Sequence, residues 1–239
     1  MVVTLDFWNT MVVAQTGGDA RRQARTEHLL ALVRRHRDEL THDDLARARR
    51  AAHARFDTVW KAEHRTLGAD DLLRYLWDEL ALTVTDDEHV ETVRVYEESL
   101  LVGAPDLTPG LVAFVHDAAR HHRLGIISDT MFSPGRVIRQ LLDRHDVLGA
   151  FDVFAFSDET GCAKPDPRAF STILDETGAA PCEATHVGDL RRTDVAGALT
   201  ANWTAIQYTG VHEDDPSHGP APDAVAPDWD AVAAALEDR

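Results

Sequence analysis

One change of pattern along this 239-residue chain restricts its fold more than any other feature. The first residues, MVVTLD, are apolar and β-branched and end in Asp6, which is typical of a strand buried in a parallel sheet. From about residue 19 to residue 100, apolar residues recur at i, i+3 and i+4, and Asp or Thr stands near the start of each periodic segment. We therefore expect about four consecutive helices with no strand between them, inserted into the chain as one helical bundle.

Helices and strands alternate again after the Gly-Ala-Pro segment at 103–105. Repeated alternation of this kind builds a parallel sheet with helices on both faces. The expected strands follow helical segments and lie near residues 124–128, 153–157, 185–187 and 204–208. A further helix is expected at 193–201, and the Asp-, Pro- and Gly-rich segment 211–230 predicts a surface loop before a last helix near 228–237.

The predicted fold class is therefore α/β, with a Rossmann-like parallel-sheet core and an inserted helical-bundle domain. We assign residues 1–14 and 103–239 to the core and residues 15–102 to the bundle. Nothing in the sequence predicts whether the chain is a monomer or an oligomer.

Charge and composition exclude several classes of function. The chain has 24 Lys and Arg against 41 Asp and Glu, a formal charge of −17, so we expect no nucleic-acid partner. No stretch approaches the roughly 18 uninterrupted apolar residues of a membrane span, and the N-terminus lacks the positive region of a signal peptide. Only two cysteines occur, Cys162 and Cys182, so we expect reduced thiols and a cytoplasmic protein.

The basic residues are distributed unevenly. Residues 16–100 carry 14 basic and 18 acidic residues, which leaves 10 basic and 23 acidic residues for the α/β part. Of the 24 basic residues only Lys61 and Lys164 are lysines, so the chain uses arginine almost everywhere that it has a cation. If the α/β part handles an anion, this shortage of cations implies that a metal ion neutralises it.

Polar residues stand where the predicted strands end. They are Asp6, Ser128, Asp189 with Asp194 five residues later, and Lys164 in the loop after the 153–157 strand. Ligands of doubly wound sheets bind outside the carboxyl ends of the strands, so we expect these side chains to meet. Clustered carboxylates repel one another unless a cation lies among them, and oxygen ligands completed by water suit Mg²⁺.

Four segments resemble the motifs of the haloacid dehalogenase superfamily, in the order that this family has them. They are LDFWNT (5–10), IISDT (126–130), FSDETGCAKPDPRAF (156–170) and HVGDLRRTDVAGA (186–198). The resemblance covers essentially the whole chain, and the helical insert is similar to the α-helical cap that this family places between its first two motifs.

The resemblance implies a hydrolase that acts through an aspartyl intermediate, most simply Mg²⁺-dependent phosphoryl hydrolysis of a small molecule. By the resemblance Asp6 is the nucleophile, the Ser128 hydroxyl binds the phosphoryl oxygens, and Lys164 neutralises the nucleophile and the bound anion. A compact ammonium suits such a buried junction better than a guanidinium does.

The same resemblance implies a metal site and a substrate site at this edge of the sheet. Asp6, the main-chain carbonyl of Trp8, Asp189 and Asp194 would hold or support Mg²⁺. Trp8, Ser128, and also Asn9 and Asp129, would lie against the substrate.

Trp8 departs from the pattern of the family's phosphatases, which have a second Asp two residues after the nucleophile as acid and base. Indole neither donates nor accepts a proton usefully at neutral pH, and general acid–base help contributes about 10²–10⁴-fold. Asn9 stands where Gly is usual, but Asn tolerates left-handed backbone geometry, so we expect the turn to survive.

Three functions remain open. In the first, a phosphoryl hydrolase uses another acid, such as Asp129, His28 or His64, or a substrate with a good leaving group. The second is a carbon–halogen or similar hydrolase, since the family's dehalogenases also lack the second Asp; the retained Asp189 and Asp194 count against it. The third is a non-enzymatic descendant that binds an anion or a protein.

Each residue also has an ordinary structural interpretation. Asp6 and Asp129 would cap strand ends or turns, and Ser128 and Asp194 would each cap the helix that follows. Trp8 would either pack in the core or project into the substrate pocket.

Overall fold

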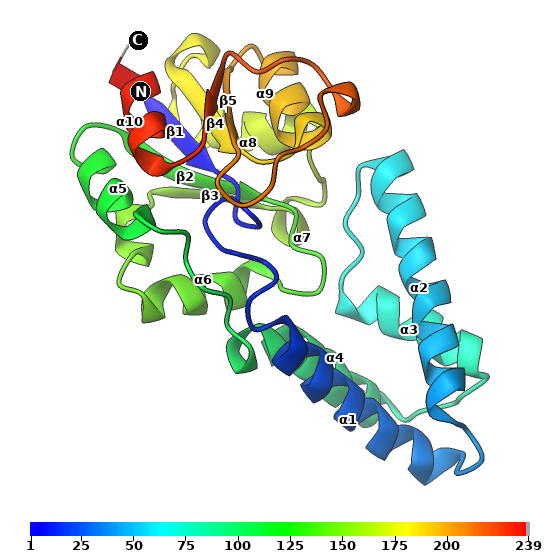
Figure 1. Ribbon diagram of the computed structural model, residues 1–239. Helices are drawn as coiled ribbons and strands as arrows, with labels where there is room; N and C mark the ends of the chain where they lie inside the picture. The colour runs from blue at the N-terminus through cyan, green and yellow to red at the C-terminus, as the bar shows by residue number, and fades with distance from the viewer. Residues whose placement is uncertain (238–239) are drawn as a thin grey trace.

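The computed structural model describes residues 1–237, and its centre is one sheet of six strands that all run parallel (Figure 1). The strands lie in the order β3-β2-β1-β4-β5-β6. Because β1 is central, its carboxyl end has β2 on one side and β4 on the other. Their bounds are β1 Val2–Leu5, β2 Arg123–Ser128, β3 Val153–Phe156, β4 Ala184–Gly188, β5 Thr204–Tyr208 and β6 Ala224–Ala226.

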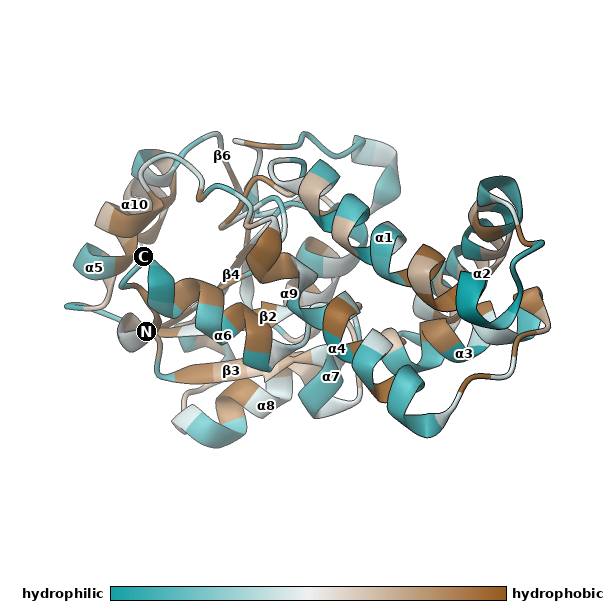
Figure 2. Cartoon of the chain, turned by 90° about the horizontal axis from the view of Figure 1, so that it is seen from below, coloured by the Kyte–Doolittle hydropathy of each residue, from teal (hydrophilic) through white to brown (hydrophobic). Residues whose placement is uncertain are grey.

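Helices cover both faces of the sheet, as the alternating pattern predicts. On one face Val3 and Leu5 of β1 share a hydrophobic core with α5, α6 and α10, and on the other Val2 shares a core with α8 and α9. Figure 2 shows brown and teal segments alternating along α6, which is the amphipathic pattern of such a covering helix. The α/β fold class is confirmed. The bounds are α5 Leu111–Ala118, α6 Gly135–Arg144, α7 Ser157–Thr160, α8 Pro167–Thr177, α9 Ala196–Thr200 and α10 Trp229–Glu237.

Four helices stand beside the sheet between β1 and α5, and we call them the cap (Figure 1). Helix α1 pairs with α4 and α2 pairs with α3 around a separate apolar core that includes Leu29, Phe56 and Leu73. The predicted boundaries of this unit, 15–102, stay a prediction. The helices are α1 Gly18–His36, α2 His42–Glu63, α3 Ala69–Leu80 and α4 Asp86–Val102.

Local sequence explains where the cap helices begin. Thr41 accepts a hydrogen bond from the main-chain nitrogen of Asp44, whose carboxylate accepts one from the nitrogen of Thr41 in return, and this capping box starts α2. Thr85 and Glu88 form the same arrangement at the start of α4. No helix within residues 1–237 is long and apolar enough to cross a membrane.

Two segments differ from the sequence-based expectation. Residues 224–226, assigned to a surface loop, form strand β6 at the edge of the sheet, where they pair with β5. A strand of three residues is too short to show a periodic pattern in the sequence. The helix expected at 193–201 begins earlier, with a π-helical turn at Arg191–Val195 that leads into α9.

Two connecting segments join the cap to the core, one before α1 and one after α4, and they contact each other at Gly17 and Gly103. Gly17 has a left-handed φ of +68°, and a Cβ there would lie 2.3 Å from the carbonyl oxygen of Gly103. Arg21 bonds the carbonyl oxygens of Ala14, Thr16 and Gly103, which ties both connections to the start of α1.

We predict that Gly17→Ala lowers the free energy of unfolding by about 1–3 kcal/mol, since it adds both a clash and backbone strain. Gly149→Ala is the matched control, because a Cβ at Gly149 meets nothing within 4 Å, and its effect should stay below about 0.5 kcal/mol. Urea denaturation of both variants measures the difference. Equal effects at the two positions would contradict the close approach of the two connections.

Candidate active site

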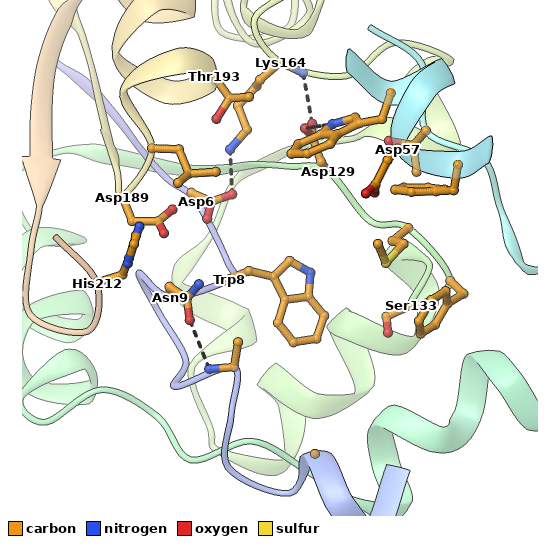
Figure 3. A pocket seen from close by; sticks show the side chains of 18 of the residues that line it. Asp6, Trp8, Asn9, Asp57, Asp129, Ser133, Lys164, Asp189, Thr193 and His212 are labelled. Atoms are coloured by element: carbon orange, nitrogen blue, oxygen red, sulfur yellow. Dashed lines mark hydrogen bonds and ion pairs between the residues drawn. The ribbon is translucent and has the colours of Figure 1, made fainter. Parts of the chain in front are cut away.

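Side chains from several strand ends meet around Lys164, at the carboxyl edge of the sheet (Figure 3). The Lys164 ammonium donates to Oδ1 of Asp6 and Oδ1 of Asp194, each at 2.5 Å, and to the carbonyl oxygen of Ile127 at 2.9 Å. These three acceptors use the three donors of a primary ammonium, and the side chain is buried. The predicted gathering of Asp6, Lys164 and Asp194 is present.

Both oxygens of Asp194 have protein partners. Its Oδ1 also lies 3.0 Å from Nε2 of His186, and its Oδ2 accepts from the main-chain nitrogen of Leu190 at 3.0 Å and from the hydroxyl of Thr193 at 3.2 Å. Asp194 therefore lies inside the π-helical turn and fixes Lys164, rather than capping the helix that follows.

Gly188 makes this position of Asp194 possible. A Cβ at residue 188 would lie 2.3 Å from Cγ of Asp194, so any larger residue at the end of β4 would displace that carboxylate. The glycine before Asp189 thus has a packing reason that the sequence alone did not reveal.

Two buried polar atoms at the same edge have no partner among the described residues. They are Oδ2 of Asp189 and the hydroxyl of Ser128. Ser128 does not cap the next helix, whose N-cap is Pro134. Buried polar groups nearly always have hydrogen-bond partners, so this pair indicates a place for a polar ligand.

The carboxylates at this edge outnumber the one lysine, and their pKa values reflect it. Burial, opposed by the charge of Lys164 and reinforced by Asp194, raises the pKa of Asp6 to about 7. Burial, with the charges of Asp194 and Asp6, raises the pKa of Asp189 well above its ordinary value. Burial also opposes the charge of Asp194, but Lys164 and His186 hold the pKa of Asp194 below its usual range.

Trp8 and Asn9 form the turn that follows Asp6. Asn9 adopts the left-handed conformation, with φ of 54°, and its side-chain oxygen accepts from the nitrogen of Ala14 at 3.4 Å. The half-buried Trp8 packs edge-on against Phe7, and its indole lines the cleft beside Asp6 (Figure 3). Of the two interpretations of Trp8, the structure supports the one in which it faces the pocket.

A cleft of about 650 Å³ lies between cap and core above these groups. Seven of the predicted site residues line it, namely Asp6, Trp8, Asn9, Asp129, Lys164, Asp189 and Asp194, whereas the buried Ser128 does not. The cap contributes Arg25, Phe56 and Asp57, among others, and His212 comes from the segment after β5. These four positions were not predicted as site residues. The packing of cap against core decides which face of a cap helix lines the cleft, and the sequence of the helix does not reveal that packing.

The three candidate acids have different surroundings. Asp129 accepts from the nitrogen of Lys164 and from the indole nitrogen of Trp60, each at 2.9 Å, and burial raises its pKa. His28 bonds the hydroxyl of Thr92 within the cap and does not line the cleft, and neither does His64. Of the three, only Asp129 lies near the reaction edge, where it joins cap to core.

Two carboxylates at this edge remain available to a magnesium ion. Within residues 1–237, no group of three or more His, Cys, Asp or Glu side chains is arranged to hold a metal. Since Asp194 is fully engaged, the carboxylates left for a cation are those of Asp6 and Asp189, of which Asp189 has a buried oxygen without a partner. Mg²⁺ is usually held by one or two carboxylates and several waters, so these residues fit it.

A family model for haloacid dehalogenase-like hydrolases matches residues 1–202 of the chain. The chain belongs to the haloacid dehalogenase-like hydrolases. A 2-haloacid dehalogenase from Pseudomonas syringae pv. Tomato has the same fold, with a TM-score of 0.75 at 19% identity over 99% of this chain and 98% of that one.

Curated relatives of this hydrolase include phosphatases, at limited coverage. It is 39% identical to a phosphoserine phosphatase of Thermus thermophilus over 85 residues, which are 33% of this chain and 34% of the relative. It is 27% identical to a pyrimidine 5'-nucleotidase of Escherichia coli over 122 residues, 51% of this chain and 50% of that protein. The matches thus span a third to a half of these relatives.

The excess of buried carboxylates predicts a pH-dependent stability. In chelator-treated hydrolase the free energy of unfolding should fall as the pH rises from about 4 to about 7, because folded Asp6 keeps a proton that the unfolded chain, with its ordinary pKa of 3.8, has released. Asp6→Asn should lack this part of the pH dependence, and Mg²⁺ should restore stability at the upper end of the range. Urea denaturation at each pH, with EDTA or with Mg²⁺, measures both effects. If the free energy of unfolding depended on pH in the same way in the wild type and in Asp6→Asn, the raised pKa of Asp6 would be contradicted.

Proposed function

We propose that this hydrolase cleaves small phosphate monoesters through a phosphoryl intermediate on Asp6. The observation that carries the proposal is the charge at the bottom of the cleft, where three buried carboxylates and one half-buried carboxylate share a single lysine, Lys164. Carboxylates in such excess need a further cation, and a bound cation makes the same place attractive to a phosphoryl group. The four carboxylates are Asp6, Asp129, Asp189 and Asp194.

Asp6, Asp189 and the main-chain carbonyl of Trp8 would hold Mg²⁺ at this place, and Asp194 would support the site by positioning Lys164. When bound, the ion would neutralise charge on the phosphoryl oxygens and lower their repulsion of the nucleophile. We place the reaction in the cytoplasm, where free thiols such as those of Cys162 and Cys182 stay reduced.

The chain's own residues supply the remaining steps. A carboxylate oxygen of Asp6 attacks phosphorus, the bond from phosphorus to the ester oxygen breaks, and the alcohol part leaves as its anion, which takes a proton from water. Lys164 favours the ionised form of Asp6 that attacks, against the effect of burial, and the Ser128 hydroxyl donates to a phosphoryl oxygen. Water then attacks the phosphorus of the intermediate, which releases phosphate and frees Asp6.

Because Trp8 replaces the usual acid, no side chain at this position donates a proton to the departing alcohol. We therefore propose that this hydrolase acts best on esters whose alcohol leaves as a stable anion. The same absence favours a second candidate function, carbon–halogen hydrolysis, because a halide needs no proton on leaving. Displacement at carbon would form an ester on Asp6 and would not need Mg²⁺, which distinguishes it from the first.

We predict that Asp6→Asn lowers turnover of a panel of small phosphates by at least about 10³-fold, because the amide oxygen is a poor nucleophile. The control is Asp175→Asn, an exposed carboxylate on α8, which should retain wild-type turnover. Release of inorganic phosphate, measured with Mg²⁺ present, reports the result.

Unchanged turnover in Asp6→Asn would refute the proposed nucleophile. EDTA should abolish phosphate release from the wild type, and Mg²⁺ should restore it. Undiminished hydrolysis in EDTA, together with halide release from 2-haloacids, would favour the dehalogenase function instead.

We also predict that Trp8→Asp raises turnover of alkyl phosphates, which are poor leaving groups, by about tenfold or more, since it restores a proton donor beside the nucleophile. Activated aryl phosphates should gain little. Trp8→Phe serves as the control, since it opens space without adding an acid. A gain that is equal in both variants would mean that the indole only obstructs the cleft.

A further inference from the structure

Arg25 of helix α1 is a buried cation without a counter-charge. Its side chain lines the cleft, and the residue is 7% exposed. Its one hydrogen bond in the structure runs from Nη1 to the hydroxyl of Ser99 at 3.1 Å, and no carboxylate of the described residues forms an ion pair with it. A buried guanidinium normally pairs with an acid, because burial without one costs several kcal/mol.

The surroundings of Arg25 supply no acidic group. Its guanidinium carbon lies 4.7 Å from the ring centre of Phe132 and 5.8 Å from that of Tyr96, and these rings attract a cation without neutralising its charge. Burial, together with the nearby charges of Arg49, Arg21 and Arg22, lowers the pKa of Arg25 to about 10. It is therefore still positively charged at neutral pH.

The other two arginines that line the cleft are already engaged. Arg21 bonds three main-chain carbonyl oxygens between cap and core, and Arg22 pairs with Asp19 and is exposed to solvent. Arg21 is buried to the same extent, but it bonds three main-chain carbonyl oxygens, whereas Arg25 makes a single hydrogen bond. Arg25 contacts Phe132, three residues after Asp129 in the chain, and lines the same cleft as Asp6.

We propose that Arg25 binds a carboxylate on the alcohol part of the substrate, so that the substrate is a small phosphate monoester that also carries a carboxylate. The inference rests on the proposed phosphatase function and narrows its substrate class. One uncompensated guanidinium matches the single charge of a carboxylate, and its planar fork pairs with both carboxylate oxygens. A second phosphate group, with up to two negative charges, would exceed the one cation available.

Apolar side chains of the cleft suit such a substrate. Trp8, Phe56 and Met131 also line the cleft and offer apolar surface to the part of the molecule that joins the two anions. The substrate would then be held at both ends, with its phosphoryl group at Asp6 and its carboxylate at Arg25.

Pairs of probes that differ only in the carboxylate test the proposal. One pair is O-phosphoserine and O-phosphoethanolamine, and the other is para-carboxyphenyl phosphate and phenyl phosphate. In the wild type, kcat/KM should favour the carboxylated member of each pair by about 10- to 100-fold, the contribution expected of a charged hydrogen-bonded pair. Arg25→Met, which keeps the length of the stem, should bring both ratios close to one, and Arg25→Lys should keep part of the preference.

Arg34→Met is the matched control, because Arg34 is an exposed arginine of the same helix, and it should keep the wild-type ratios. A wild type without preference, or an unchanged preference in Arg25→Met, would overturn the carboxylate subsite. The wild-type ratios decide the point even if Arg25→Met fails to fold, which a thermal melt would reveal.

Binding to Asp6→Asn, measured by calorimetry, separates this inference from the proposed function. If no probe is hydrolysed by the wild type but the carboxylated members bind Asp6→Asn more tightly, and Arg25→Met in that background removes the difference, then the subsite is supported and the phosphatase function fails. If hydrolysis depends on Asp6 but neither turnover nor binding responds to the carboxylate, the function is supported and the subsite fails.

Discussion

The contact between the Lys164 ammonium and two buried carboxylates is the interaction on which the rest of the site depends. Lys164 joins Asp6 at the end of β1, the carbonyl oxygen of Ile127 in β2 and Asp194 in the turn after β4. Removing one partner of such a buried pair leaves an uncompensated charge and typically costs about 3–5 kcal/mol. The lysine therefore fixes the relative positions of three strand ends, but it neutralises only part of their charge, and the remaining negative charge gives the edge its affinity for a cation.

The cap meets the core close to the same lysine. Asp129 accepts from Lys164 of the core with one oxygen and from Trp60 of the cap with the other, and the carbonyl oxygen of His64 accepts from Ala163, the residue before Lys164. The loop that carries the lysine thus contacts both units. A shift of α2 would move the groups that hold this loop, so cap position and the geometry at Asp6 are physically linked, and a closed cap would keep water from the reaction edge.

Much of this arrangement could be predicted from the sequence, because it depends on local patterns and on the rule for parallel sheets. The strand that ends at Asp6, the left-handed turn at Asn9 and the capping box at Thr41 each follow from residue types at fixed spacing. The expected role of Asp129 as an acid is less well supported, since both its oxygens accept hydrogen bonds from the cap and from the lysine loop. Strand β6 is defined by its neighbour β5 rather than by its own three residues, so its pattern carried no signal.

The burial of Arg25 belongs to the same class of unpredictable features. In the sequence it is one of several arginines on an amphipathic helix, where the solvated interpretation is the ordinary one. Only the packing of α1 against α4 and of Phe132 against the cap reveals that this arginine is buried without an acidic partner. Side chains that confer specificity on such a fold thus depend on contacts between the two units, which local sequence does not encode.

The central claim, that Asp6 attacks the phosphorus of a substrate, is tested most directly by trapping the intermediate. Wild-type protein mixed with Mg²⁺ and para-carboxyphenyl phosphate is quenched in acid during the first turnover, and its N-terminal peptide is analysed by mass spectrometry. The account predicts that the peptide gains the mass of one phosphoryl group, that fragmentation locates the group on Asp6, and that Asp6→Asn shows no such gain. Product formation with an unmodified Asp6 peptide at every quench time, or with the phosphoryl group on another residue, would contradict it.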